Sequence, residues 1–393
     1  MRCRRCIVRS DFPGVLLDGT NLCNICSVWD SLEDRLTDFS ALKEVFVSKL
    51  SDVKGQCEYD AVVGLSGGKD GAYVLHALTK EYGLRVLALT LDLGFMPNTF
   101  AKENAARVTS ALGVEHETVR LPDELVRKLF SNYLSKPTTT TPCHLCTSIL
   151  GLALGIKVAV EFKIPKIVAG LDRGQLLNKL HLKHARRRVL ESIGPHKRDE
   201  ARRNLEKTIS RLNLYFRWLG LNANERSFIL PSPRPISRLE EVPEIMMYFL
   251  HHPHDEEEIK RLLERETGWI RPDGDIGRGH FDCELKELAG EAANRLGLGG
   301  RLEYELSVDI REGALTRDQA LARLAKEGDS SEGTQSPFHI VESRLGMSQS
   351  GFESKVDRLA KIAPYYAKGS NALIRAFGLG GRLEKLLFLI RPH

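Results

Sequence analysis

The sequence predicts an α/β protein: a doubly wound parallel sheet, with a cysteine-rich segment before it and a helical region after it. Short apolar runs alternate with helical segments between residues 59 and 172, as expected when buried parallel strands are joined by crossover helices. Two Cys-x2-Cys pairs lie within the first 26 residues. A chain of 393 residues, 42% of them hydrophobic, is long enough for two or three structural units.

The N-terminal cysteines predict a zinc ribbon over residues 1–30. Cys3 and Cys6 are followed, after sixteen residues, by Cys23 and Cys26. Four thiolates at this spacing can close a tetrahedral site, and a structural zinc would staple a segment too short to fold alone. A catalytic zinc is disfavoured because four Cys ligands leave no open position on the metal.

The predicted elements then follow in order. Residues 31–54 form a helical connector, and residues 55–254 form the domain that contains the sheet. We expect strands at Tyr59–Ser66, Arg85–Asp92, His116–Leu121 and Lys166–Asp172. We expect helices at Gly71–Tyr82, Ala101–Leu112, Pro122–Leu134, Thr147–Phe162 and, after a proline-rich stretch, Val242–His251. Residues 255–393 are predicted to be helices broken by glycine-containing turns.

A glycine-rich loop, Ser66-Gly67-Gly68-Lys69-Asp70-Gly71, joins the first strand to the first helix. The glycines let backbone N–H groups approach an anion, and the helix N-terminus adds further free donors. Ser66 supplies a hydroxyl and Lys69 a cation, so the loop is a predicted pyrophosphate site. It matches neither GxxxxGK[ST] nor GxGxxG. A plain strand-to-helix turn with a surface lysine is the alternative.

The strand, the SGGKD loop and the helix together resemble the PP-loop ATP pyrophosphatases, a HUP-like family that cleaves ATP between the α- and β-phosphates. The resemblance implies that ATP and Mg²⁺ bind at Ser66–Gly71, with Lys69 and Asp70 as catalytic residues. It also implies that Asp92 and Asp172, which end two later strands, lie near the nucleotide. The family motif usually ends in Ser where this chain has Gly71, so one hydroxyl contact to phosphate is absent.

A second chemical motif is the pair Cys143 and Cys146, which opens an apolar helix. The dipole at a helix N-terminus lowers the pKa of a thiol, so the pair is predicted to be reactive or metal-binding. Two buried structural cysteines are the alternative. Cys283 lies far downstream, and it is either a third member of this set or a small buried hydrophobic residue.

The position of this pair resembles the catalytic Cys-x2-Cys of the tRNA thiolases in the PP-loop family. In those enzymes a third cysteine follows an Arg-Pro-Leu…Glu…Ile segment, and the three can hold an iron–sulfur cluster. The matching residues here are Arg234-Pro235-Ile236, Glu241 and Ile245. The resemblance implies that Cys143 and Cys146 are catalytic, either as a persulfide relay or, with Cys283, as ligands of a 4Fe-4S cluster. Three ligands would leave one iron open to bind sulfide.

The layout of the chain also resembles the N-acetyl sugar amidotransferases. They likewise carry two N-terminal Cys-x2-Cys pairs, a PP-loop and a downstream helical region like Ala314–Leu324. In that family, ammonia from a glutaminase partner attacks an adenylated N-acetyl oxygen. This second resemblance implies nitrogen transfer instead of sulfur transfer.

A basic segment spans Lys179–Arg203. Its lysines and arginines are suited to contact the phosphates of RNA or of a nucleotide-linked substrate. The interleaved acids Glu191, Asp199 and Glu200 make a solvated helical face the alternative.

The overall composition is that of an ordinary soluble protein. A net charge of +5 and a pI near 8.7 suit an anionic ligand such as ATP, a sugar nucleotide or RNA, without requiring one. No apolar run follows the N-terminus, and the apolar stretch at Ile149–Val160 is too short and mixed to cross a bilayer. We therefore expect a cytoplasmic protein with no membrane partner, and a homodimer remains open.

Together these features predict an enzyme that adenylates a carbonyl oxygen with ATP, releases pyrophosphate, and then inserts sulfur as AMP leaves. The acceptor would be a tRNA base, a sugar nucleotide or a small molecule, and a sulfur donor is an expected partner. The rival enzyme prediction is nitrogen transfer with a glutaminase partner. The non-enzyme rival is an RNA-binding module.

Overall fold

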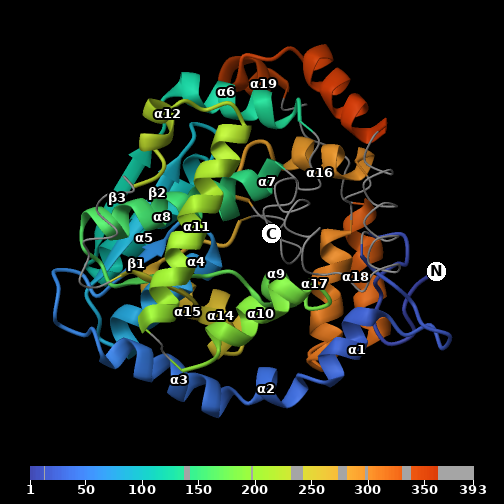
Figure 1. Cartoon of the computed structure of the whole chain (residues 1–393), viewed down its shortest axis with the longest axis horizontal. Coiled ribbons are helices and arrows are strands. Elements are labelled where there is room, and N and C mark those ends of the chain that lie inside the picture. Colours follow the sequence, from blue (N-terminus) through green and yellow to red (C-terminus); the bar gives the residue numbers. More distant parts are fainter. Residues whose placement is uncertain are drawn as a thin grey trace.

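A five-stranded parallel sheet lies at the centre of the computed structural model (Figure 1). The structure describes residues 1–12, 14–136, 142–195, 198–231, 242–272, 281–296, 300–329 and 338–361. The strands are β1 (Ala61–Gly64), β2 (Val86–Asp92), β3 (Glu115–Arg120), β4 (Lys166–Ala169) and β5 (Glu244–Met247). Their order, β3-β2-β1-β4-β5, places the point where the winding reverses between β1 and β4.

Helices cover both faces of the sheet, so the predicted doubly wound fold is confirmed. One face packs against α6 (Asp123–Tyr133), α8 (Gly151–Glu161) and α11 (Arg198–Trp218). The other packs against α3 (Phe39–Ser51), α4 (Lys69–His76), α5 (Thr99–Leu112) and α15 (Glu256–Thr267). Alternate residues of β1 point to opposite faces of the sheet. Val62 packs into the hydrophobic core on the first face, whereas Ala61 and Val63 pack into the core on the second.

The remaining helices include the predicted C-terminal set. They are α1 (Asn24–Asp30), α2 (Glu33–Thr37), α7 (Pro142–His144), α9 (Arg173–Leu177), α10 (Lys183–Ser192), α12 (Ala223–Ser227), α14 (Tyr248–His251), α16 (Lys286–Arg295), α17 (Arg301–Arg311), α18 (Arg317–Asp329) and α19 (Phe338–Leu345). Two segments, η1 (Ala77–Glu81) and η2 (Leu145–Leu150), are π-helical. The proposed domain boundaries remain predictions.

The predicted helix at Val242–His251 is wrong over its first half. Residues Glu244–Met247 form β5, which pairs with β4 in parallel, and helix α14 begins only at Tyr248. A run of four residues is too short for its periodicity to separate a strand from a helix. The strand forms here because of tertiary packing. The edge of β4 provides backbone N–H and C=O groups that pair with Glu244–Met247, and Lys166 forms an ion pair with Glu244 at 2.8 Å across the two strands.

The N-terminal segment packs against α17, which lies about 300 residues further along the chain. Arg2 forms an ion pair with Glu303 at 2.6 Å, and the ring of Phe12 stacks on Tyr304 with centroids 5.1 Å apart. Figure 1 shows the N-terminus beside α17 and α18. The cysteine-rich segment and the C-terminal helices therefore share a common core.

One helix in the described part of the chain is long and apolar enough to cross a membrane. It runs from Pro142 to Glu161, with a mean hydropathy of 1.8 in its most apolar window. The sequence analysis considered only the apolar stretch Ile149–Val160 and judged it too short to cross a bilayer, whereas the helix already begins at Pro142. Of that window, 61% is buried inside the protein, and α8 packs on β1, β2 and β4. Its apolar character is thus accounted for by the core of the α/β domain.

Candidate functional site

The glycine-rich loop lies where the sheet changes its winding direction, between β1 and α4. Gly67 has φ +88°, and a Cβ there would collide with the backbone of Ala101. The indole N–H of Trp269 donates to the Gly67 carbonyl at 2.9 Å. Crevices at such points, outside the carboxyl ends of parallel strands, are where ligands bind in this fold class. The loop therefore has the location and the backbone conformation of an anion-binding turn.

The loop residues Lys69 and Asp70 belong to a charged cluster. The ammonium group of Lys69 lies 3.0 Å from Asp70 and 3.9 Å from Glu256. The other oxygen of Asp70 accepts a hydrogen bond from Nε2 of His254 at 2.8 Å. The imidazole of His254 is only 5% exposed and packs edge-on against Phe249. Asp70 is thus held between two basic side chains from separate elements.

These neighbours fix the charge states of the cluster. Burial alone would lower the pKa of Lys69, but Asp70, Glu256 and Asp172 outweigh it and raise that pKa to about 12. Burial would likewise raise the pKa of Asp70, but Lys69 and His254 lower it overall. Lys69 is therefore a cation, and Asp70 an anion, throughout the physiological pH range.

Gly71 has a structural reason to be glycine. An added Cβ would lie 2.6 Å from the carbonyl oxygen of Gly64, closer than real Cβ contacts come. Gly170, after β4, is equally confined, because its Cβ would lie 2.9 Å from the carbonyl oxygen of Asp70. The ends of β1 and β4 thus press against the first turn of α4. The Ser that usually ends the family motif does not fit this arrangement.

A Gly71→Ala substitution is accordingly expected to lower the free energy of unfolding by about 1–3 kcal/mol, because the overpacked backbone must shift. The matched control is Gly290→Ala in α16, where nothing lies within 4 Å of the added Cβ. That change should be neutral or stabilising by up to about 1 kcal/mol. Urea unfolding of both variants checks the pair, and equal stabilities would contradict the packing argument.

Asp172 and Asp92, the two predicted strand-end contacts, have different surroundings. Asp172 caps α9 by accepting from the backbone N–H of Gln175 at 2.9 Å, and its charge acts on Lys69. Asp92 is bound at 3.0 Å by Lys102 and at 3.1 Å by Arg120, and it also accepts from the Gly94 N–H. Asp172 therefore borders the loop, whereas three donors already surround Asp92. Their roles toward a nucleotide remain predictions.

The predicted cysteine trio is brought together from two distant segments. Cys146 lies in η2 and is buried, Cys283 packs against the same hydrophobic core, and α7, which carries Cys143, contacts α16. Residues 281–284 dock on the connection between β2 and α5: the Asn98 N–H donates to the Asp282 carbonyl at 2.9 Å, and the Glu284 N–H to the Phe95 carbonyl at 3.0 Å. Because that connection leads to Ala101, which touches Gly67, it joins the cysteines to the loop.

The expectation that the helix dipole lowers the pKa of this pair is wrong for Cys146. Burial raises the pKa of Cys146 well above its usual value, and burial together with Cys143 raises that of Cys283 to about 12. Cys146 lies beyond the first turn of the helix that begins at Pro142, where the effect of the helix dipole fades. Both thiols are therefore protonated unless a metal or a reaction partner stabilises the thiolate.

The four N-terminal cysteines form a buried cluster that can hold a metal ion. The sulfurs of Cys3, Cys6, Cys23 and Cys26 all lie within 4.8 Å of one another, and each residue is 0% exposed. The pairs Cys3–Cys26 and Cys6–Cys23 are 4.0 and 3.7 Å apart. A tetrahedron with Zn–S bonds of about 2.3 Å has edges of roughly 3.8 Å, so the residues fit a single zinc ion.

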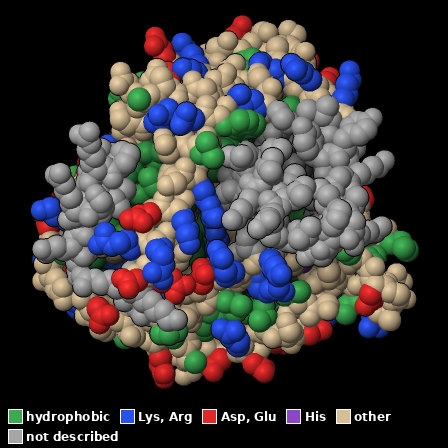
Figure 2. Space-filling model, in the orientation of Figure 1, with side chains coloured by type: hydrophobic (Ala, Val, Ile, Leu, Met, Phe, Trp, Pro, Cys, Tyr) green, Lys and Arg blue, Asp and Glu red, His purple; other side chains and the backbone are tan. Residues whose placement is uncertain are grey.

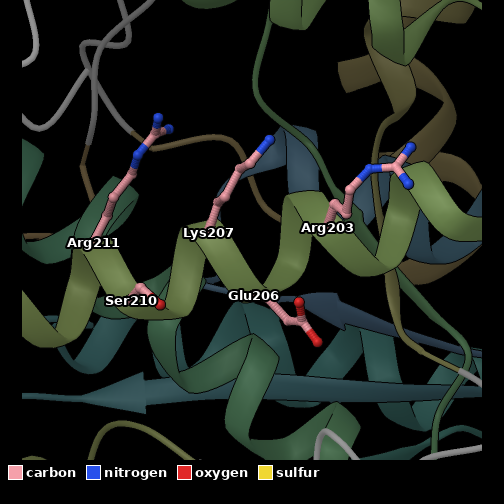
Figure 3. A pocket seen from close by; sticks show the side chains of 5 residues that line it. All are labelled: Arg203, Glu206, Lys207, Ser210 and Arg211. Atoms are coloured by element: carbon pink, nitrogen blue, oxygen red, sulfur yellow. The ribbon is translucent and has the colours of Figure 1, made fainter.

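The basic segment continues into a cationic stripe along α11. Arg203, Lys207 and Arg211 lie at intervals of four residues around an open cavity of about 410 Å³, which Glu206 and Ser210 also line. Figure 3 shows the three cationic side chains pointing to the same side of the helix, and Figure 2 shows lysines and arginines gathered in the middle of this face. Helix α10 adds positive charge beside this stripe. Burial, followed by the charges of Arg211 and Arg187, lowers the pKa of Arg188 in α10 to about 10.

Two residues that contact the candidate sites were not predicted from the sequence, and part of one predicted motif lies outside the described residues. His254 lies 184 residues from its partner Asp70, and Arg311 lies 285 residues from its contact Cys26, so no local pattern marks either. Residues Arg234-Pro235-Ile236 and Glu241 fall outside the described residues, whereas Ile245 lies in β5.

Comparison with known proteins gives one sequence relative. No family model matches the chain. The chain is 27% identical to the tRNA-specific 2-thiouridylase MnmA 2 of Fusobacterium nucleatum over 112 residues, which are 28% of this chain and 32% of that protein. The match therefore spans about a third of the relative's length.

Two solved structures are also similar to the chain. One is the U34-tRNA thiolase NcsA from Methanococcus maripaludis with its [4Fe-4S] cluster, at 15% identity, covering 79% of this chain and 87% of that one, with a TM-score of 0.30. The other is the NH3-dependent NAD synthetase from Campylobacter jejuni, at 16% identity, covering 51% and 95%, with a TM-score of 0.28.

Proposed function

We propose that this chain is an ATP-dependent sulfurtransferase that converts a carbonyl group of a tRNA base into a thiocarbonyl. One observation carries the proposal: the segment that contains Cys283 and the glycine-rich loop both contact the connection between β2 and α5. Either motif alone has simpler explanations. Their junction at the carboxyl edge of one sheet favours an enzyme that activates an oxygen with ATP and then handles sulfur.

In the first half of the reaction, the acceptor's carbonyl oxygen attacks the α-phosphorus of ATP and pyrophosphate leaves. The backbone amides of Ser66–Gly71 and the ammonium group of Lys69 hold the phosphates, with Mg²⁺ offsetting their charge. Asp70 orients Lys69 through their 3.0 Å ion pair, and His254 holds Asp70 in turn. In the second half, a sulfur nucleophile attacks the activated carbon, and AMP departs with the original oxygen.

Cys143, Cys146 and Cys283 are proposed to handle the sulfur. As three ligands of one 4Fe-4S cluster they would leave one iron open, which would supply a site for sulfide. Cys3, Cys6, Cys23 and Cys26 would hold the structural zinc. ATP turnover to AMP and pyrophosphate that depends on tRNA is the direct test of the function.

The cationic stripe on α11 is proposed to contact the phosphate backbone of the RNA. The double charge reversal Arg203→Glu with Lys207→Glu should weaken tRNA binding by about tenfold or more at low salt, and should reduce its salt dependence, because two phosphate contacts are lost. Filter binding at several salt concentrations measures both quantities. Arg217→Glu, an exposed arginine in the last turn of the same helix, is the matched control. Equal losses in both variants would indicate a general charge effect and contradict a specific stripe.

A further inference from the structure

The four-cysteine cluster is in contact with a buried arginine that lies 285 residues after Cys26. Arg311 closes α17 and is 2% exposed. Its Nε lies 3.4 Å from the sulfur of Cys26, and its Nη2 lies 3.7 Å from the sulfur of Cys6. Four thiolates around a divalent ion leave an excess of two negative charges, which a buried guanidinium partly offsets. Metal occupancy therefore strengthens the attraction that holds the end of α17.

The next residue of the chain, Glu312, contacts a different element. The carboxylate of Glu312 forms an ion pair with Nε of Arg173, the first residue of α9. Arg173 is 2% exposed, and it also donates to the carbonyls of Leu36 at 2.7 Å and Phe249 at 3.1 Å. This arginine thus joins α9 to α17, to the connector and to α14. Adjacent residues of one helix end therefore link the cysteine cluster to α9.

The start of α9 borders the phosphate loop. Arg173 directly follows Asp172, which caps α9 and contributes to the raised pKa of Lys69. Gly170 in the same turn approaches the backbone of Asp70 so closely that a Cβ would lie 2.9 Å from its carbonyl oxygen. A shift of this turn would move the carboxylate of Asp172 and the first turn of α4 together. The nucleotide loop is therefore sensitive to the position of Arg173.

We propose that Arg311, Glu312 and Arg173 are positioning residues through which the metal-loaded cysteine cluster fixes the nucleotide site. The inference rests on the proposed function only in taking ATP as the ligand of the loop. With the metal bound, Arg311 anchors the end of α17, Glu312 holds Arg173, and the turn carrying Asp172 keeps its place. Without the metal this chain of contacts loosens, and ATP binds more weakly.

The test uses the full chain, with ATP affinity measured by calorimetry and zinc content by elemental analysis. Glu312→Gln keeps the cluster and its arginine but removes one charge of the ion pair. We expect unchanged zinc content and an ATP dissociation constant raised about tenfold. Arg2→Gln is the matched control, since it breaks the 2.6 Å ion pair between the N-terminal segment and α17 without touching α9. It should leave ATP affinity unchanged.

A second variant approaches the coupling from the metal side. Arg311→Met should release zinc to a chelator about 10–100-fold more readily, as expected for loss of an outer-shell partner, and should weaken ATP binding as zinc leaves. Arg311→Lys, which restores the charge without the planar fork, should recover part of both effects. A purely structural role would lower unfolding stability in the control and in Glu312→Gln alike, without a selective loss of ATP affinity.

Two outcomes separate the inference from the proposed function. If the zinc-loaded wild-type chain fails to bind ATP, the proposed function is overturned. If the wild-type chain binds ATP and both Glu312→Gln and the zinc-depleted protein bind it equally well, the function stands and the coupling is wrong. A selective loss of ATP affinity in Glu312→Gln, with zinc retained, supports the coupling.

Discussion

Replacing Cys143 with Ser is expected to reduce thiolated product by about three orders of magnitude, while ATP is still cleaved to AMP and pyrophosphate in the presence of tRNA. Adenylation requires only the phosphate loop and the acceptor, whereas sulfur insertion requires a thiolate or a cluster ligand that serine cannot replace. Cys143 is the better first choice because it is partly exposed, so the hydroxyl of the variant has access to water. Mass spectrometry of tRNA nucleosides and a pyrophosphate assay measure the two halves separately.

The matched control for this variant is Cys57→Ser. Cys57 is also partly exposed, lies ahead of β1, and has no proposed role in the reaction. It should retain full product formation. If Cys143→Ser and Cys146→Ser likewise form thiolated product at the wild-type rate, this cysteine set does not handle the sulfur, and its proposed role is contradicted.

Lys69→Met is expected to weaken ATP binding by about 100-fold or more and to remove detectable pyrophosphate release. The ammonium group supplies the positive charge at the phosphate loop, and it also compensates Asp70 and Glu256 at 3.0 and 3.9 Å. Its removal leaves these carboxylates facing the site, so an anionic ligand meets net repulsion. Calorimetric titration with ATP and a pyrophosphate assay measure the loss.

Two comparisons make the result specific to Lys69. Lys80→Met removes an exposed lysine from η1, just after the same helix, and should leave ATP affinity unchanged. Because the loss of Lys69 also affects folding stability, urea unfolding of each variant shows that the protein remains folded under assay conditions. Wild-type ATP affinity in a folded Lys69→Met protein would remove Lys69 from the phosphate site.

The sequence was sufficient for the core of the fold because its signals are local. Two long apolar runs gave β1 and β2, and the glycine-rich loop between the first strand and the first helix was found in the predicted place. The same local reasoning failed at β5, where four residues become a strand only because β4 offers a free edge. It also failed for the thiol of Cys146, since burial is a property of tertiary packing and overrides the helix dipole.

The parts of the site that sequence reasoning missed share one cause. His254 meets Asp70, and Arg311 meets Cys26, across separations of 184 and 285 residues, so their roles follow only from the way the chain folds back. Gly71 was predicted only in part. The sequence showed its departure from the family motif, but only the approach of the Gly64 carbonyl explains why a side chain is excluded.

The central claim is that adenylation of a tRNA carbonyl precedes sulfur insertion by this chain. The most direct test incubates the full-length protein, loaded anaerobically with iron and sulfide, with unmodified tRNA and ATP. AMP and thiolated nucleoside are then counted in the same reaction. The account predicts that one AMP forms for each sulfur-for-oxygen exchange, and that neither forms when tRNA or ATP is omitted. AMP release without any thiolated nucleoside, or thiolation without AMP, would contradict it.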